Sequence, residues 1–178
     1  MAWFGKKDPA APSTPTPKSG GARPKASKVS ALLSTECILI QPGGGDKNAV
    51  LESVVKCLCK TQGFPAPELF LNKVLEREKG ISTTLDTGLS LPHARMDDLP
   101  AIVAGMAVLP QGIPDPQQSD LLIRVMFVFF SPNKPEAFPL HLQLLRSVSS
   151  IFQPAFIDQL AAAKTPADAL ELIKKVEG

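Results

Sequence analysis

Apolar residues recur at helical spacing before and after a central stretch in which they alternate or run on without a break. The first helical run lies between Asp46, a candidate N-cap, and Gly63, a candidate stop, because polar caps begin helices and glycine often ends them. Its apolar face comprises Val50, Leu51, Val54, Val55 and Leu58. A second helix is expected from Pro65 and Pro67 to Gly80, since proline fits the first turn of a helix.

The central stretch has the pattern of β-strands. Four segments qualify: Ser82–Leu85, Leu89–Leu91, Ile102–Leu109 and Leu121–Phe130. The last of them is apolar almost throughout, apart from Arg124, which is typical of a strand covered on both faces.

Three more helices are expected after the strands: Glu136–Phe152, Pro154–Ala163 and Pro166–Val176. Thr165 is placed to cap the last one, with Asp168 three residues later in a capping box. Helices before and after a group of strands predict a single α/β (α+β) domain, with a mixed central sheet of about four to five strands sandwiched by helices. The pattern does not determine the strand order.

Residues 1–30 differ in composition from the rest of the chain. They are rich in Pro, Ala and Lys and have little to bury, so we expect a disordered leader before a domain over residues 31–178. Trp3 and Phe4 could dock on the domain or a partner, or remain free. The leader holds six basic residues and one Asp, which leaves thirteen basic and sixteen acidic residues in the domain. This mildly acidic balance argues against a nucleic-acid-binding core.

Neither a membrane span nor a secretory signal is expected. No stretch approaches the roughly 20 apolar residues that cross a bilayer, and the first residues lack an apolar signal core. A cytoplasmic location and reduced thiols at Cys37, Cys57 and Cys59 follow. No metal site is expected, because no second pair of ligands follows Cys57 and Cys59.

His93 stands where an apolar strand pattern breaks. Pro92 removes a ladder donor just before it, so the sequence predicts that His93 is presented at a strand end. An imidazole can exchange a proton or a phosphoryl group near neutral pH, and Arg95 offers a cation suited to phosphate oxygens. The other histidine, His141, is expected near the start of a helix, where free N–H groups favour anions. The alternative for each histidine is a structural role.

The stretch from Arg77 to Arg95, REKGISTTLDTGLSLPHAR, resembles a known signature. It is similar to that of the fructose/mannitol-type IIA domains of the bacterial phosphoenolpyruvate:sugar phosphotransferase system, including their nitrogen-related regulatory members. The shared features are Arg-Glu, Ser-Thr, a glycine before an apolar-small-apolar triplet, and Pro-His, in the same order and without a gap. The segment that begins at His141, after a strand ending in Phe-Phe-Ser-Pro, resembles the family's second histidine region. The resemblance covers about residues 31–176.

The resemblance implies a phosphocarrier that needs no metal, nucleotide or other cofactor. The histidine matching His93 accepts a phosphoryl group from HPr or an HPr-like phosphocarrier protein and passes it to a cysteine of a IIB domain. Arg77 and His141 match the family's site residues, and we expect them to stabilise the phosphate.

Supporting roles in phosphate binding are expected for Glu78, Ser82, Thr83 and Arg95. The alternatives are ordinary surface charges for Glu78 and Arg95, and residues that merely begin a strand for the two hydroxyls. Asp86 replaces a glycine common in relatives, and its carboxylate would oppose an anion if its loop folded inward.

Two functions remain open at this point. One is phosphoryl transfer in a phosphotransferase chain. The other is a regulatory binding module, whose phosphorylation state controls partner proteins through the added charge. A third possibility, a relative kept for its structure or for binding alone, is disfavoured by the intact His93, Arg77 and His141.

Overall fold

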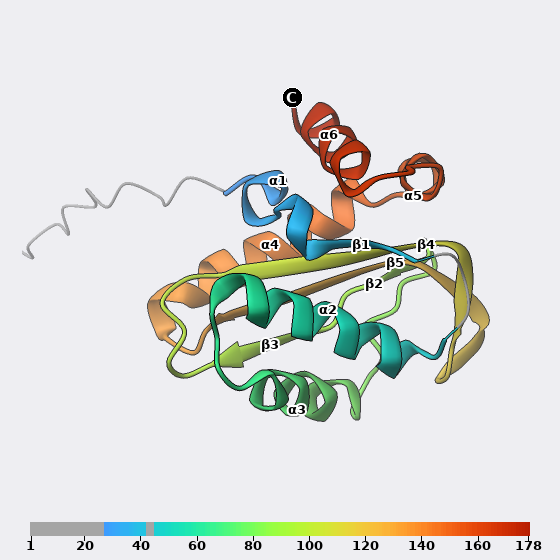
Figure 1. Cartoon of the computed structure of the whole chain (residues 1–178). Coiled ribbons are helices and arrows are strands. Elements are labelled where there is room, and N and C mark those ends of the chain that lie inside the picture. Colours follow the sequence, from blue (N-terminus) through green and yellow to red (C-terminus); the bar gives the residue numbers. More distant parts are fainter. Residues whose placement is uncertain (1–26, 42–44) are drawn as a thin grey trace, which may run out of the picture.

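The computed structural model describes residues 27–41 and 45–178. Within them, five strands form one mixed sheet: β1 (Ile38–Ile40), β2 (Leu89–Ser90), β3 (His93–Met96), β4 (Val103–Asp115) and β5 (Gln118–Pro132). The strand order is β1-β4-β5-β2, and β3 also pairs with β5 (Figure 1). Only β4 and β5 are antiparallel; the other pairs are parallel. The prediction of one mixed sheet is confirmed.

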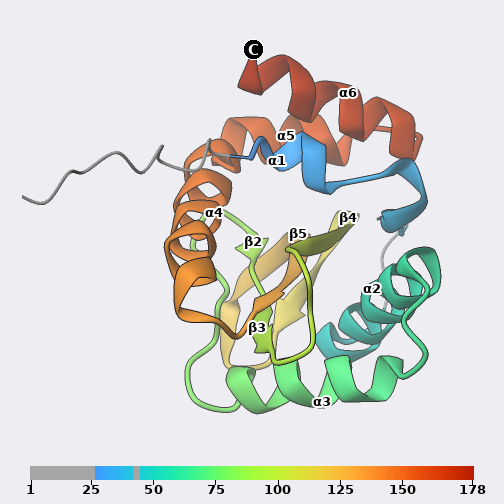
Figure 2. The same cartoon turned by 90° about the vertical axis from the view of Figure 1, so that its left-hand side faces the viewer.

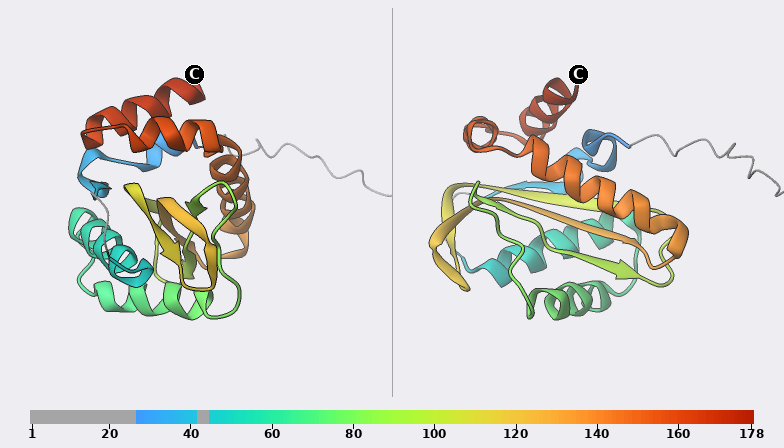
Figure 3. Two further views of the ribbon diagram at one scale, coloured as in Figure 1. Left: turned by 90° about the vertical axis from the view of Figure 1, so that its right-hand side faces the viewer. Right: turned by 180° about the vertical axis from the view of Figure 1, so that it is seen from behind.

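In the part of the chain that the structure describes, six α-helices surround the sheet: α1 (Val29–Leu32), α2 (Lys47–Gln62), α3 (Pro67–Glu78), α4 (Phe138–Ile151), α5 (Pro154–Ala161) and α6 (Pro166–Glu177). Figure 2 shows α4 on one side of the sheet and α2 with α3 on the other, while α1, α5 and α6 lie together above the sheet in this view. The two views of Figure 3 show the same arrangement from the opposite sides. None of these helices is both long enough and apolar enough to span a bilayer.

The middle of the sheet is buried on both faces, and the side chains of β5 point alternately into the two cores. Val125, Phe127 and Phe129 belong to the core beneath α1, α4, α5 and α6. Their neighbours along the strand, including Met126 and Phe130, belong to the core beneath α2 and α3. This alternation explains the nearly unbroken apolar run and confirms the prediction of a strand covered on both faces.

The expected helix boundaries agree with the structure to within about two residues. The Asp46 side chain accepts a hydrogen bond from the backbone of Ala49, and Gly63 ends α2 in the left-handed conformation. Thr165 and Asp168 form the expected capping box at the start of α6. The helix expected from Glu136 begins with a short 3-10 turn, Pro135–Ala137, before α4.

The strand prediction was wrong at four places. β1 was not predicted, because three residues are too few to show a strand pattern, and β4 runs to Asp115, six residues beyond the predicted end at Leu109. Ser82–Leu85 is not a strand; only Thr84 forms an isolated bridge, with Ser90, because the neighbouring β2 has just two residues and offers no longer ladder. His93 does lie at a strand end, but at the first residue of β3, which the pattern did not predict. Pro92 separates β2 from β3 along the edge of the sheet. Both strands still pair with β5, because β5 is long enough to reach both.

Most of the expected leader, with Trp3 and Phe4, lies outside the described residues. Residues 27–30 are described, and α1 begins among them at Val29, which is fully buried. The Glu177 carboxylate accepts hydrogen bonds from the backbone N–H groups of Val29 (2.6 Å) and Ser30 (3.0 Å). The two ends of the described chain therefore lie side by side, as Figure 1 shows for α1 and α6.

Candidate functional site

His93 is held against the sheet by its ring and by one of its nitrogens. The ring stacks on Phe129, with centroids 5.3 Å apart and an interplanar angle of 11°. Nδ1 lies 2.8 Å from the carbonyl oxygen of Leu91. A carbonyl can only accept a hydrogen bond, so Nδ1 carries the proton and the neutral ring has its lone pair on Nε2. Only 9% of the residue is exposed, so this orientation is well constrained.

His141 reaches the same place from α4. Its ring lies 5.3 Å from the His93 ring, centroid to centroid, at an angle of 61°. The ring packs beside Phe129 and stacks with Phe138, and its Nδ1 lies 2.7 Å from the Ser131 hydroxyl oxygen. Residues 48 positions apart in the sequence thus form one pair of imidazoles.

Both imidazoles are held in the neutral form. Burial lowers the pKa of His93, an effect opposed by the Leu91 hydrogen bond and reinforced by the Arg77 charge. Burial lowers the pKa of His141 to about 4, with further lowering by His93, Arg95 and Arg77. A neutral imidazole is the nucleophilic form, so near pH 7 the ring of His93 is ready to react.

Three cations surround the histidines. Lys73 and Arg77 on α3 and Arg95 on β3 line, with both histidines, a small hollow of about 210 Å³. The Arg95 guanidinium lies 5.1 Å from the centre of the Phe138 ring and donates to the Lys134 carbonyl oxygen at 2.9 Å. Its Nε is buried and makes no hydrogen bond within the described residues.

Glu78, Ser82 and Thr83 lie apart from this hollow. Thr83 donates its hydroxyl to Glu78 (2.6 Å), and Ser82 donates to Asp115 (3.0 Å). The structure therefore joins His93, His141, Arg77 and Arg95 in one hollow and gathers the other three candidates in a neighbouring polar cluster.

Asp86 is exposed in the turn before β2. The neighbouring Gly88 carbonyl accepts from the Arg124 backbone, whereas His93 pairs with Phe129, five residues further along β5. At about 3.3 Å per residue this places the turn roughly 16 Å from His93. Asp86 therefore does not oppose an anion at His93.

Several residues of the site, in the hollow or in contact with the two histidines, were not identified from the sequence. Lys73 precedes Arg77 by one helical turn, a spacing that could have been noticed on α3. Ser131 and Phe129 belong to an apolar strand and carry no local pattern of a site. The Leu91 carbonyl is a backbone group, which only the fold can direct at a ring.

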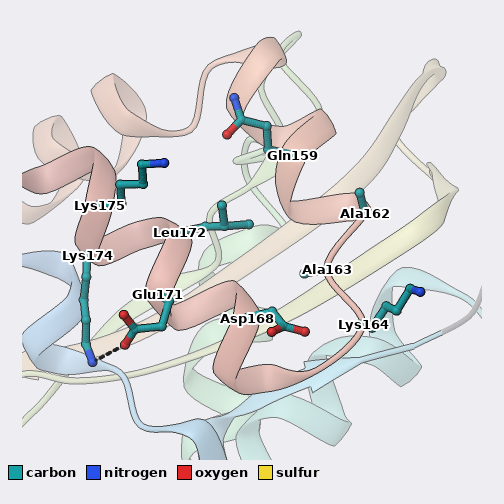
Figure 4. A pocket seen from close by; sticks show the side chains of 9 residues that line it. All are labelled: Gln159, Ala162, Ala163, Lys164, Asp168, Glu171, Leu172, Lys174 and Lys175. Atoms are coloured by element: carbon teal, nitrogen blue, oxygen red, sulfur yellow. Dashed lines mark hydrogen bonds and ion pairs between the residues drawn. The ribbon is translucent and has the colours of Figure 1, made fainter.

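A larger hollow lies away from the histidines. It measures about 770 Å³ and lies between α5 and α6. Figure 4 shows the side chains around it, with Glu171 and Lys174 paired and no histidine among them. Within the described residues, no group of three or more His, Cys, Asp or Glu side chains could hold a metal ion.

Comparison with known proteins gives consistent matches over most of the chain. The family described as "Phosphoenolpyruvate-dependent sugar phosphotransferase system, EIIA 2" matches residues 31–176. A nitrogen regulatory protein of Pseudomonas aeruginosa is 25% identical over 152 residues, covering 84% of this chain and 97% of that protein.

Solved structures show the same fold. Nitrogen regulatory protein IIA-Ntr of Neisseria meningitidis superposes with a TM-score of 0.71 at 18% identity, covering 83% of this chain and 99% of that one. Enzyme IIA-mannitol of Escherichia coli, in its complex with phosphorylated enzyme IIB-mannitol, gives a TM-score of 0.67 at 21% identity, with 80% and 97% coverage.

Proposed function

Because this chain belongs to the EIIA 2 family of the phosphoenolpyruvate-dependent sugar phosphotransferase system, we propose that His93 carries a phosphoryl group on Nε2. The observation that carries the proposal is the 2.8 Å contact between Nδ1 and the Leu91 carbonyl. This contact uses Nδ1–H as a hydrogen-bond donor and leaves the lone pair of Nε2 as the nucleophile. We expect this chemistry in the cytoplasm, with an HPr-like phosphocarrier protein as donor.

The proposed transfer consists of two in-line displacements. In the first, the Nε2 lone pair attacks the phosphorus of the donor's phosphohistidine, the donor's P–N bond breaks, and its imidazole leaves with the electron pair. The new P–N bond adds positive charge to the His93 ring, and the Leu91 carbonyl stabilises that charge through Nδ1–H. In the second, a cysteine thiolate of a IIB domain attacks the phosphorus and Nε2 leaves.

The surrounding cations stabilise the transferring phosphoryl group. Arg77, Arg95 and Lys73 present positive charge around the hollow, where charge on the three equatorial oxygens must be balanced during transfer. His141 supports the same oxygens in the tautomer whose Nδ1 accepts from the Ser131 hydroxyl, because Nε2–H is then the donor to a phosphoryl oxygen. Its low pKa keeps it neutral, so it binds by hydrogen bonding and not as an ion.

Labelling tests the proposal directly. The full chain is incubated with enzyme I, an HPr-like protein and labelled phosphoenolpyruvate, and the phosphohistidine isomer is identified by ³¹P NMR. We expect label on Nε2 of His93 and none in His93→Ala. The matched variant His141→Ala should still be labelled but should pass the label to a IIB protein about 100-fold more slowly. Label in His93→Ala, or on Nδ1 of the wild type, would contradict the assignment.

A regulatory role is the second candidate. The relative from Pseudomonas aeruginosa is named a nitrogen regulatory protein, and two apolar side chains of α4, Phe138 and Leu142, are 44% and 48% exposed beside His141. A phosphoryl group on His93 would add about −1.5 to −2 charges at the edge of this surface. If label stays on His93 in the presence of IIB proteins while a partner binds only one phosphorylation state, the regulatory role is the correct one.

A further inference from the structure

A buried ionic cluster lies beside the histidines. Lys47, at the start of α2, places Nζ 3.0 Å from Glu78 Oε2 and 3.0 Å from Asp115 Oδ2. The three residues are 5%, 8% and 0% exposed. Two carboxylates and one ammonium are therefore held out of water at the meeting point of α2, α3 and β4. Such a group is costly to bury, so a role beyond stability is worth testing.

The cluster is connected to His93 by an unbroken series of contacts. Glu78 Oε1 accepts from the Thr83 hydroxyl at 2.6 Å. The Thr83 carbonyl accepts from the Leu91 N–H at 3.1 Å, and the Leu91 carbonyl accepts from His93 Nδ1 at 2.8 Å. Glu78, whose charge Lys47 neutralises, thus holds Thr83 in place. Thr83 in turn fixes the backbone of Leu91, whose carbonyl orients the His93 ring.

The two carboxylates depend on Lys47 to different degrees. Asp115 also accepts hydrogen bonds from the hydroxyls of Ser82 and Thr84 and from the backbone of Gln117 and Gln118. Glu78 Oε2 has no hydrogen bond within the described residues, and Lys47 is its ion-pair partner. Loss of the ammonium would therefore leave the Glu78 charge uncompensated.

An uncompensated Glu78 would act on His93 in two ways. A second anion near the ring opposes the arrival of a phosphoryl group, and it also favours the protonated, unreactive imidazole. The Glu78 charge already raises the pKa of His93, against the larger effect of burial. The other charged and titratable groups facing the ring are Lys73, Arg77, Arg95 and His141.

We propose that Lys47 is a positioning residue for phosphoryl transfer at His93: its ammonium group neutralises Glu78 and holds the contacts through Thr83 and Leu91 that orient the ring. The proposal rests on the proposed function of His93. It adds a residue that does not touch the phosphoryl group and lies 46 positions away in the sequence.

The test uses the full chain and two readouts: the initial rate of His93 phosphorylation by the HPr-like donor, and the pKa of His93 by NMR titration. Lys47→Met removes the ammonium and keeps the length of the side chain. We expect the rate to fall about tenfold and the pKa of His93 to rise by about 0.5. Lys56→Met is the matched control, because Lys56 is also on α2 but pairs with Glu52 at the surface; it should change neither readout.

A second comparison separates neutralisation from a merely structural role. In a Glu78→Gln background the amide can still accept from Thr83, but it carries no charge. Adding Lys47→Met to that background should leave the rate and the His93 pKa unchanged. If Lys47→Met alone does not fold, the comparison of Glu78→Gln with the double variant still tests the proposal.

The proposal is overturned if Lys47→Met matches the wild type in both readouts, or if its effect persists undiminished in the Glu78→Gln background. If instead His93 is not the phosphorylated residue, the wild type itself remains unlabelled at His93, so the two failures can be told apart. The NMR titration does not depend on phosphorylation, so it tests the electrostatic link in either case.

Discussion

At the scale of single residues, the two histidines differ in their freedom to react. His93 has one nitrogen bound to a carbonyl, which fixes the position of its proton. His141 is only 5% exposed and packs between aromatic rings, with three cationic or titratable neighbours that disfavour its protonated form. These different environments suit the proposed roles of His93 as nucleophile and of His141 as neutral donor.

The depressed pKa of His141 predicts a loss of stability in mild acid. The pKa is 6.5 in an unperturbed histidine and about 4 here, so the unfolded chain binds more protons between these values and unfolding is favoured as the pH falls. The free energy of unfolding should drop by at most about 3 kcal/mol from this residue between pH 7 and pH 4.

Urea unfolding at a series of pH values measures this effect. His141→Gln keeps a side-chain amide that can bond Ser131 but cannot titrate, so its stability should fall less steeply below pH 6.5. Part of the fall will remain, because burial also lowers the pKa of His93. Identical pH dependence in the wild type and in His141→Gln would refute the assignment.

At the scale of elements, the entry into β2 depends on the backbone of Gly88. Its φ is +91°, and a Cβ added there would lie 3.3 Å from the Leu122 carbonyl oxygen. Glycine is thus required before the Leu-Ser-Leu triplet, because the turn approaches β5 closely. This approach sets the register in which β2 pairs with β5, and hence the position of His93 on β5. This glycine of the Arg77–Arg95 stretch thus has a steric cause.

Gly88→Ala should accordingly destabilise the fold by about 2 kcal/mol, through the positive φ and the close contact. Gly80→Ala is the control in the same part of the chain, because a Cβ there meets only the Arg77 carbonyl oxygen at 3.9 Å and the φ is not positive. It should change stability by no more than about 0.5 kcal/mol. Equal denaturant midpoints for the two variants would exclude this explanation.

At the scale of the whole molecule, the described chain is closed by contacts between its ends. Glu177 accepts from the first N–H groups of α1, and the Lys28 side chain donates to the Gly178 carbonyl at 2.7 Å. These contacts hold α1 against α6 over the core that also contains α4. The face of the sheet opposite α2 is thereby completed by segments from both ends of the sequence.

Glu177→Ala should lower the free energy of unfolding by about 1–2 kcal/mol, because a charged acceptor for two helix N–H groups is lost. Glu171→Ala provides the comparison: Glu171 is on the same helix and pairs only with Lys174 at the surface, so the expected loss is at most about 0.5 kcal/mol. Thermal and urea unfolding measure both. A loss in Glu177→Ala no larger than in Glu171→Ala would show that the link between the ends contributes nothing.

The sequence by itself predicted every helix except α1, together with the buried central strand and the single mixed sheet, and it singled out His93 as a candidate, because periodicity, caps and the Arg77–Arg95 stretch are local properties of a chain. It did not reveal β1 or β3, since strands of three and four residues form only where long partners such as β4 and β5 are available. Nor did it connect Lys47 and Asp115 with Glu78, or Ser131 with His141. Those contacts join residues from separate elements, and their distances depend on how the helices pack on the sheet. Only the tertiary structure could decide which nitrogen of His93 is free, because a backbone carbonyl brought to the ring by the fold makes that choice.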